Sequence, residues 1–302
     1  MHNRRKIIPI VRGGLGNQLF IYSMARGLSL RCDADLVIDN ISGFVNDKKY
    51  KRIYLLDNFN ISGKLANEEE YFCSVPKVKR SIWSLESVWK PLEYRRYVYQ
   101  KSSDFDRSIK EFCPIGDCFI KGYWQSELYF DDIKDLIKKE LVLRNEKEFN
   151  EDLLCADIVN SESVAIHLRF FEIDEGILVN DEVYEEKLSY YRSAISYLKN
   201  KINKPKFFVF SNAPEHAKKM LKSMDCELFF ITERDNVENN LRDFSLMKKC
   251  KYFIIANSTF SWWAAWLGNY PEKIVVCPKL FKANGVGAWG FQGLLPESWV
   301  KL

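Results

Sequence analysis

The sequence predicts an α/β protein built from two domains, each with a parallel sheet. Three observations lead to this prediction. The chain has 302 residues, a length that suits two domains. Its first 40 residues read as strand, glycine-rich turn, helix and strand, and its second half alternates short apolar runs with amphipathic segments. Continuous apolar strands that alternate with helices are typical of parallel sheets covered on both faces.

The first part of the chain opens with a βαβ unit. A strand is expected over Ile7–Val11 and a second over Leu36–Asp39, with a glycine-rich turn over Gly13–Asn17 after the first. Between the turn and the second strand, apolar residues recur at spacings of three and four, as they do on one face of a helix. The stretch from residue 40 to 160 shows short apolar bursts and many aromatic residues, and one helix is expected there, over Asp131–Leu141.

The second half predicts a regular alternation of strands and helices. Strands are expected over Val164–Leu168, Phe207–Phe210, Leu228–Ile231, Tyr252–Ala256 and Ile274–Cys277, and helices over Glu182–Lys201, Pro214–Met224, Leu241–Lys249 and Ser261–Leu267. This change in pattern indicates a boundary near residue 155, which gives domains 1–155 and 156–302.

The charge distribution argues against a nucleic-acid partner. The formal net charge is +4, far from the basic surface of a nucleic-acid-binding protein. One stretch differs, because Cys73–Lys101 contains seven lysine or arginine residues against two glutamates, interleaved with tryptophan and tyrosine. Two interpretations stay open: a solvated surface, or a patch that contacts anionic lipid or an anionic acceptor.

The cysteines and the apolar runs indicate a reducing, aqueous environment. The eight cysteines form no CxxC pair and the three histidines are far apart in sequence, so structural zinc is not expected. Cys226, Cys250 and Cys277 lie beside or within apolar segments, as reduced thiols in a core do. The first apolar stretch is too short for a signal peptide and no run of about 18 apolar residues follows. The chain is therefore expected to be cytoplasmic.

An arginine at a strand end is the first candidate ligand-binding residue. Open parallel sheets bind ligands at the carboxyl ends of their strands, and His167 and Arg169 lie at such an end. The guanidinium offers a planar fork of donors that suits a diphosphate. The alternative is an ion pair with a carboxylate of the following loop, which contains Glu172, Asp174 and Glu175.

The second candidate is the turn after the apolar strand Tyr252–Ala256. It comprises Asn257, Ser258, Thr259 and Phe260. Small polar residues at a helix start leave backbone N–H groups free to bind an anion. The alternative is ordinary N-capping by a hydroxyl side chain. The tryptophans that follow at helical spacing are expected in the core; they are Trp262, Trp263 and Trp266.

Three further patterns are weaker. Ser211 and Asn212 also end a strand, but Ser-Asn-x-Pro is common turn chemistry. The turn Gly13–Asn17 resembles a phosphate-binding turn, but it lacks the GxGxxG spacing of a dinucleotide fold and the Lys-Ser/Thr of a P-loop. The Asp-x-Asp strings at Asp33–Asp35 and Asp104–Asp106 are interpreted as surface.

Together these strings resemble a known family. The run Gly13–Phe20 resembles the opening signature of the α-1,2-fucosyltransferases of glycosyltransferase family 11, and Asp243–Leu267 is similar to that family's C-terminal signature. One position departs from the family pattern His-x-Arg-Arg-Gly-Asp. Here the first arginine is Arg169, but Phe170 replaces the second arginine and Glu172 replaces the aspartate.

The resemblance implies a GT-B-like enzyme with two Rossmann-like domains whose parallel sheets face a central cleft. The N-terminal domain would bind the acceptor and the C-terminal domain a GDP-sugar. The donor implied is GDP-β-L-fucose, used with inversion and with no metal or other cofactor. The acceptor implied is a galactose-type residue of an oligosaccharide or lipid-linked glycan in surface polysaccharide or O-antigen synthesis, so peripheral contact with the inner membrane face is expected.

The resemblance also implies roles for individual residues. Arg169 and the helix start at Asn257–Phe260 would neutralise the departing diphosphate. Asp243 would read guanine, unless it only supplies a charge near a helix N-terminus. The general base would be Glu172, with Asp174 and Glu175 as rivals. The other residues expected to contact the donor are Gly14, Gly16, Asn17, His167, Ser211, Asn212, Ser258 and Thr259.

Two other functions remain as alternatives. A GT-B enzyme with another GDP-sugar donor or linkage would share the same motifs. A sugar- or nucleotide-binding module without catalysis is suggested by the replacement of the second arginine.

Overall fold

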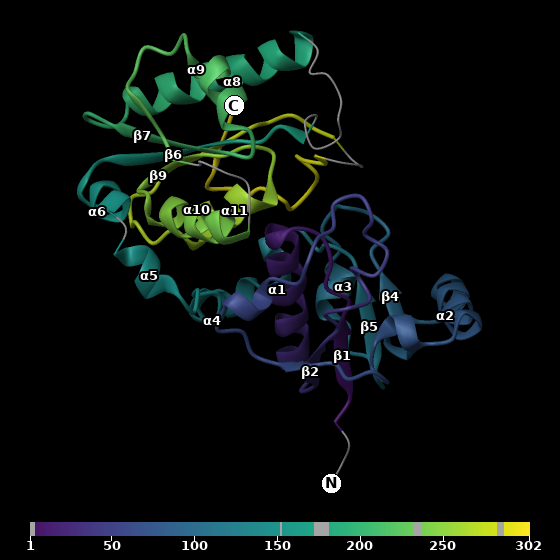
Figure 1. Ribbon diagram of the computed structural model, residues 1–302. Coiled ribbons are helices and arrows are strands. Elements are labelled where there is room, and N and C mark those ends of the chain that lie inside the picture. Colours follow the sequence, from purple (N-terminus) through teal and green to yellow (C-terminus); the bar gives the residue numbers. More distant parts are fainter. Residues whose placement is uncertain (1–3, 152, 172–180, 232–236, 283–286) are drawn as a thin grey trace. The chain divides into compact units, whose positions relative to one another are not determined.

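The computed structural model describes residues 4–151, 153–171, 181–231, 237–282 and 287–302 (Figure 1). The chain forms two compact units, one of Met1–Arg144 with Phe291–Leu295 and one of Asn145–Gly290 with Pro296–Leu302. This division precedes the boundary predicted near residue 155. Residues between the two positions contact the second unit, where α5 and α6 lie against α10 and Nζ of Lys248 is 2.7 Å from Oε1 of Glu146.

The first unit is a five-stranded parallel sheet in the order β3-β2-β1-β5-β4. Its strands are β1 Lys6–Pro9, β2 Asp35–Ile38, β3 Lys64–Leu65, β4 Tyr97–Tyr99 and β5 Cys118–Lys121, and its helices are α1 Leu15–Arg31, α2 Lys77–Trp89, α3 Arg107–Glu111 and α4 Lys134–Glu140. The predicted βαβ opening is confirmed. The strands and helices of residues 40–120 were not predicted, because they are short and lack a clear period.

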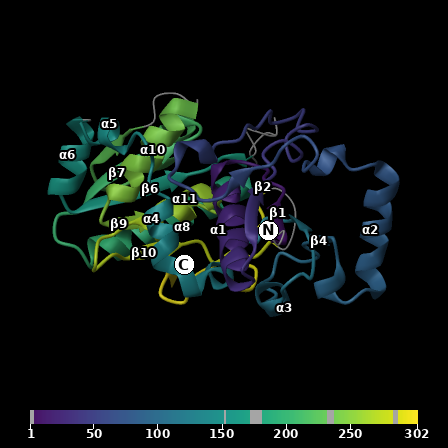
Figure 2. The same ribbon diagram turned by 90° about the horizontal axis from the view of Figure 1, so that it is seen from below.

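The two faces of this sheet are covered by different helices. Side chains alternate between faces along a strand, and Ile8, Ile10 and Phe119 pack in one cluster with Phe72 and Trp83 of the α2 side. Helix α1 contacts β1 and β2. Figure 2 shows α1 and α2 on opposite sides of the sheet. One face of the sheet is therefore covered by α1, and the other by an aromatic cluster to which α2 contributes Trp83.

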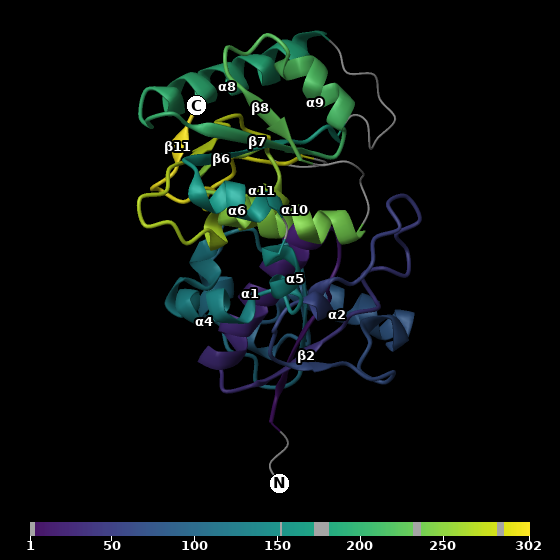
Figure 3. The same cartoon turned by 60° about the vertical axis from the view of Figure 1, so that its left-hand side comes forward.

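The second unit is a six-stranded parallel sheet in the order β11-β10-β9-β6-β7-β8. Its strands are β6 Ser163–Leu168, β7 Lys206–Ser211, β8 Leu228–Phe230, β9 Tyr252–Ile254, β10 Val275–Cys277 and β11 Val300–Lys301. Its helices are α5 Glu146–Asn150, α6 Leu153–Asn160, α8 Asp181–Lys199, α9 Pro214–Leu221, α10 Val237–Lys249 and α11 Thr259–Leu267. Figure 3 shows α8 and α9 on one face of the sheet and α6, α10 and α11 on the other. The strands and helices predicted for this half are confirmed, as is the α/β class.

Strand β6 is the centre of this sheet, and its six residues are all buried. Val164, Ile166 and Leu168 pack in one cluster with residues of α8 and α9. Because side chains alternate along a strand, Ala165 and His167 face the opposite layer, which contains α11. The alternation of side chains along β6 thus directs the His167 side chain toward the layer that contains α11.

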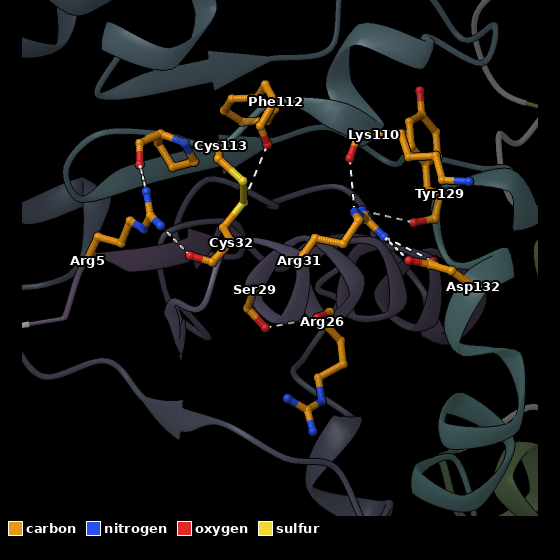
Figure 4. The surroundings of a disulfide bond; sticks show 11 residues. Arg5, Arg26, Ser29, Arg31, Cys32, Lys110, Phe112, Cys113, Tyr129 and Asp132 are labelled. Atoms are coloured by element: carbon orange, nitrogen blue, oxygen red, sulfur yellow. Dashed lines mark hydrogen bonds and ion pairs between the residues drawn. A yellow bond between two sulfur atoms is a disulfide. The ribbon is translucent and has the colours of Figure 1, made fainter.

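A disulfide joins Cys32, at the C-terminal end of α1, to Cys113, which follows α3 (Figure 4). Arg5 lies beside the bridge and donates to the carbonyl of Cys32 at 2.6 Å and to that of Pro114 at 3.0 Å. The sequence analysis did not predict this pairing, and the bridge does not fit the reducing environment expected from the cysteines. The free state expected for three other cysteines is confirmed, namely for Cys226, Cys250 and Cys277.

Within the described ranges, no helix has the length and apolar character needed to cross a membrane.

Candidate active site

The strand order of the second unit places its topological switch point between β6 and β9. From β6 the chain order runs outward through β7 and β8 on one side and through β9, β10 and β11 on the other. Parallel sheets bind ligands outside the carboxyl ends of the strands at such a point. Arg169 follows β6 and Asn257 follows the strand beside it, since Ile166 pairs with Ile254. Two of the predicted site segments are therefore neighbours.

His167 connects these two segments. Its Nδ1 lies 2.9 Å from Oγ of Ser261 in the first turns of α11, and its ring centroid lies 5.6 Å from that of Phe260. Its carbonyl accepts a hydrogen bond of 2.8 Å from the hydroxyl of Tyr191 on α8. Burial, and to a smaller extent the charge of Arg169, lower the pKa of His167 to about 3. The imidazole is therefore neutral near pH 7 and positions α11 against β6 without adding charge.

Arg169 directly follows β6 and makes a cation–π contact. Its guanidinium carbon is 5.4 Å from the ring centroid of Phe171. A guanidinium at the carboxyl end of a parallel strand is a suitable donor group for an anion bound there.

The loop after β6 is held by Asn212, which follows β7. The Asn212 side chain accepts from the backbone N–H of Phe170 at 2.9 Å and donates to the carbonyl of Phe170 at 3.2 Å. This pair of bonds fixes the backbone next to Arg169. Ser211 makes a local turn contact, because its Oγ accepts from the N–H of Ala213 at 3.1 Å. The amide of Asn212 thus serves the geometry of the loop, and Ser211 shows the turn chemistry considered as its alternative.

The start of α11 has the features of an anion-binding helix end. Ser258 is the N-cap residue with an extended backbone, and its side chain makes no capping hydrogen bond to the helix residues described. Capping by this hydroxyl, the alternative interpretation, is therefore not what this residue does. At the other end of α11, Nζ of Lys273 donates to the carbonyls of Ala265, Trp266 and Gly268 at 2.8, 3.1 and 2.8 Å. A cation there complements the negative end of the helix dipole.

Gly287 lies next to Asn257 and Phe171. The side-chain amide of Asn257 donates to the Gly287 carbonyl at 3.4 Å. Gly287 has φ of +72°, and an added Cβ would lie 3.2 Å from the ring of Phe171 and 3.3 Å from Nδ2 of Asn257. Both the backbone angle and the close approach favour glycine.

The rest of α11 is core, as predicted. Trp262 and Trp263 are fully buried and Trp266 is nearly so.

Asp243 lies in the middle of α10, and its side chain is buried. Nη1 of Arg242 is 3.8 Å from Oδ1 of Asp243. The ring of Phe244, the next residue, lies 5.4 Å from that of Phe260 at the start of α11. Since α10 begins at Val237 and dipole effects fade within the first turn, the role of a helix N-terminal charge does not fit Asp243.

The predicted general bases lie outside the described residues. They are Glu172, Asp174 and Glu175, and their role stays a prediction.

The first unit brings together a second set of strand-end residues. Gly14 is the N-cap of α1, and Gly16 and Asn17 lie in its first turn. Oδ1 of Asn17 accepts 2.7 Å from Nε2 of Gln125, which follows β5. Gly13 has φ of +77° and an added Cβ would lie 2.9 Å from Nδ2 of Asn17. This glycine therefore permits the turn that places Asn17 between β1 and β5, where the strand order of this sheet reverses.

Four residues at this edge were missed by sequence reasoning: Arg12, Gln100, Tyr123 and Gln125. The guanidinium carbon of Arg12 lies 5.2 Å from the ring centroid of Tyr123. Oε1 of Gln100, after β4, accepts from the N–H groups of Tyr123 and Trp124 at 2.7 and 3.2 Å. Each of these residues follows a strand. The signal for Gln100, Tyr123 and Gln125 was lost because β4 and β5 were not predicted, whereas Arg12 follows the predicted first strand and was overlooked beside the glycine-rich turn.

The Asp-x-Asp strings are surface features, as predicted. Asp106 caps α3 by accepting from the N–H of Ser108 at 2.9 Å, and Asp33 pairs with Arg4 at 2.8 Å. Among the described side chains, no three histidine, cysteine or acidic residues gather as metal ligands would.

Comparison with known proteins agrees with this architecture. The family model described as glycosyl transferase family 11 matches residues 6–285. An alpha-1,2-colitosyltransferase from Escherichia coli is 30% identical over 313 residues, covering 98% of each chain. The O-antigen biosynthesis glycosyltransferase WbnK from Escherichia coli is 28% identical over 311 residues, covering 96% of this chain and 98% of WbnK.

Solved structures show the same fold at low identity. Arabidopsis thaliana FUT1, a mutant in complex with GDP, superposes with a TM-score of 0.54 at 13% identity, covering 95% of this chain and 72% of that one. NodZ alpha-1,6-fucosyltransferase co-crystallised with GDP gives a TM-score of 0.52 at 14% identity, covering 87% of this chain and 92% of NodZ. The two parallel-sheet units are thus those of a GT-B-like fold. Together with the family match, these findings establish that the chain is a member of glycosyl transferase family 11.

Proposed function

We propose that this glycosyltransferase moves L-fucose from GDP-β-L-fucose, with inversion, to a hydroxyl of a galactose-type residue, forming an α-1,2 linkage in surface polysaccharide or O-antigen synthesis. The observation that supports the proposal most is the meeting of Arg169 and the start of α11 at one switch point, linked by His167. The E. coli relatives support the glycan context, since one is named for O-antigen biosynthesis and the other for an α-1,2 transfer.

In the proposed reaction the acceptor hydroxyl attacks the anomeric carbon from the side opposite GDP. The bond between the sugar and the β-phosphate oxygen breaks, and its electron pair leaves on the diphosphate. Arg169 and the backbone N–H groups at the start of α11 would meet this growing charge with fixed dipoles and one cation. Removing one such donor typically raises the barrier by ~3–4 kcal/mol. In this proposal the protein itself supplies the countercharge, with no metal or other cofactor.

Guanine recognition is assigned to Asp243. Its carboxylate can accept hydrogen bonds from N1–H and the 2-amino group of guanine, donors that adenine does not present. The burial of this carboxylate strengthens such bonds, because a low local dielectric increases their electrostatic energy.

The proton of the acceptor hydroxyl would pass to Glu172, at the position where the family pattern has aspartate. We expect Glu172→Gln to lower turnover by about 10²- to 10⁴-fold, since general-base catalysis typically contributes that much. Turnover should be measured against Asp174→Asn and Glu175→Gln in parallel. A near-normal rate for Glu172→Gln, together with a large loss in one of the others, would reassign the base.

A colitosyl donor is the second candidate, because one E. coli relative is named as a colitosyltransferase. Colitose is the 3-deoxy form of L-fucose, so both sugars would present the same leaving group to Arg169. The two donors differ only at one hydroxyl of the sugar. Protein contacts to the sugar, outside the diphosphate site, must therefore distinguish them.

A comparison of donor sugars tests the proposal. The purified chain is incubated with GDP-fucose, GDP-colitose and GDP-mannose in turn, each with a panel of β-galactosides, and the linkage of each product is determined by NMR. The proposal expects an α-1,2 product with GDP-fucose at the highest kcat/KM. A higher kcat/KM with GDP-colitose would establish the second candidate, and GDP binding without any product would indicate a binding module.

A further inference from the structure

Helix α2 of the first unit buries only one narrow face. Arg80 lies with its guanidinium carbon 5.5 Å from the ring centroid of Phe72. Trp83 stacks on Phe119 of β5 with ring centroids 6.0 Å apart, and Ser87 is 2% exposed. Arg80, Trp83 and Ser87 are spaced by three and four residues, so they share one side of the helix. This side anchors α2 to the sheet.

The opposite side of α2 is apolar and faces water. Its large side chains are exposed to 71% at Val78, 49% at Ile82, 66% at Leu85, 80% at Val88 and 72% at Trp89. Four of these residues, Val78, Ile82, Leu85 and Trp89, recur at spacings of four, three and four and form one stripe. Soluble proteins rarely expose a contiguous apolar surface of this kind without a partner for it.

Two lysines of α2 flank this apolar stripe. Lys77 and Lys79, on either side of Val78, are exposed at the start of the helix. Within Cys73–Lys101, Glu86 and Lys90 pair with each other at 3.2 Å, so their charges offset. The segment as a whole has seven lysine or arginine residues against two glutamates. The solvent-facing surface of α2 is therefore an apolar stripe with one lysine on either side of its first turn.

We propose that α2 docks on an anionic lipid bilayer, with the apolar stripe inserted among the headgroups and the flanking cations in contact with acidic lipids. An amphipathic helix with cations beside its apolar face lies in the membrane interface. With 13 residues, α2 is about 20 Å long, too short to span a bilayer of ~30 Å. Figure 1 shows α2 at the margin of the first unit, beyond β4.

The positive charge beside the apolar stripe favours an anionic bilayer over a second copy of the chain as the partner of α2. Two copies meeting through α2 would bring the lysines of both together, whereas an anionic bilayer supplies the opposite charge. The docking proposal is independent of the donor and linkage proposed above, since no residue of α2 takes part in them.

The test uses the full chain and vesicle flotation. The apparent Kd is measured for phosphatidylglycerol–phosphatidylcholine vesicles and for pure phosphatidylcholine vesicles. We expect clear binding only to the anionic vesicles, with binding reduced in 0.5 M salt because screening weakens the contribution of the cations.

Two variants separate the two contributions. The triple change Val78→Ser, Leu85→Ser, Trp89→Ser should weaken binding by on the order of 100-fold, because three large apolar groups lose their insertion. The double change Lys77→Gln, Lys79→Gln should weaken it by about tenfold or more. The matched control replaces three exposed apolar residues of the second unit, with the changes Leu153→Ser, Val159→Ser and Phe281→Ser. The control should bind as the wild type does.

Three results would overturn the proposal. One is equal flotation of the wild type and the triple variant. Another is equal affinity for neutral and anionic vesicles. The third is a concentration-dependent dimer, seen without lipid by light scattering and abolished by the triple variant, which would make a second copy the occupant. Thermal unfolding verifies that each variant is folded. If the triple variant is unfolded, the test is repeated with Leu85→Glu, a single change at a 66% exposed position.

Discussion

Replacing His167 should remove a specific pH dependence from the stability of the second unit. The ring is buried between β6 and α11 and contacts Ser261 and Phe260. Burial, with a smaller contribution from the charge of Arg169, lowers its pKa to about 3. An unfolded histidine has a pKa of about 6.5. The folded state therefore binds fewer protons than the unfolded state in the range between these two values.

The sign and size of the effect follow from this difference. A group with a lowered pKa in the folded state stabilises the fold fully above its unfolded pKa, and this contribution is lost as the pH falls. At pH 5, about 1.5 units below the unfolded value, the loss is ~2 kcal/mol at ~1.36 kcal/mol per unit. The wild-type second unit should thus be ~2 kcal/mol less stable at pH 5 than at pH 8 from this residue alone.

The assay is urea unfolding at pH 5 and at pH 8. Unfolding is detected by hydrogen exchange of peptides from β6 and α11, so that the signal comes from the second unit. His167→Gln should remove ~2 kcal/mol of the difference between the two pH values, whatever its stability at pH 8. His216→Gln on α9 is the matched control and should leave the difference in place. The reasoning fails if His167→Gln keeps the full pH dependence.

Two further changes test other parts of the structure. Asp243→Asn should weaken GDP binding by about 30- to 100-fold, the loss expected when hydrogen bonds to a charged acceptor are removed. Isothermal titration with GDP and with ADP measures this loss. Unchanged selectivity between GDP and ADP would assign Asp243 a packing role. Cys113→Ser should lower the free energy of unfolding of the first unit by about 2–4 kcal/mol, because the Cys32–Cys113 bond closes a segment with a sequence separation of 81 residues. Equal urea midpoints for the variant and the wild type would contradict this stabilisation by the disulfide.

The second unit was more predictable from sequence than the first. Strands β6 and β9 are buried on both faces, so they appear in the sequence as continuous apolar runs. Once those runs are recognised as neighbours in a parallel sheet, the residues after them, Arg169 and Asn257, become site candidates. Strands β3 and β4 have two and three residues, which is too short for a periodic signal.

Other features depend on tertiary contacts that no local pattern encodes. The Cys32–Cys113 bond depends on how α1 and the segment after α3 pack, and eight cysteines allow many pairings. The role of Asn212 in holding Phe170 needs the positions of two strand ends. The apolar stripe of α2 has a helical period, but the sequence does not show that this face is turned to solvent.

The central claim is that one guanidinium and the start of α11 hold a nucleotide diphosphate. Isothermal titration of GDP and of guanosine into the wild type and Arg169→Ala tests it most directly, with Arg192→Ala on α8 as the matched loss of a cation. We predict that Arg169→Ala weakens GDP binding by on the order of 100-fold, as expected for lost charge-assisted hydrogen bonds, while guanosine binding stays unchanged. GDP affinity within about threefold of the wild type, or an equal loss for guanosine, would contradict the account.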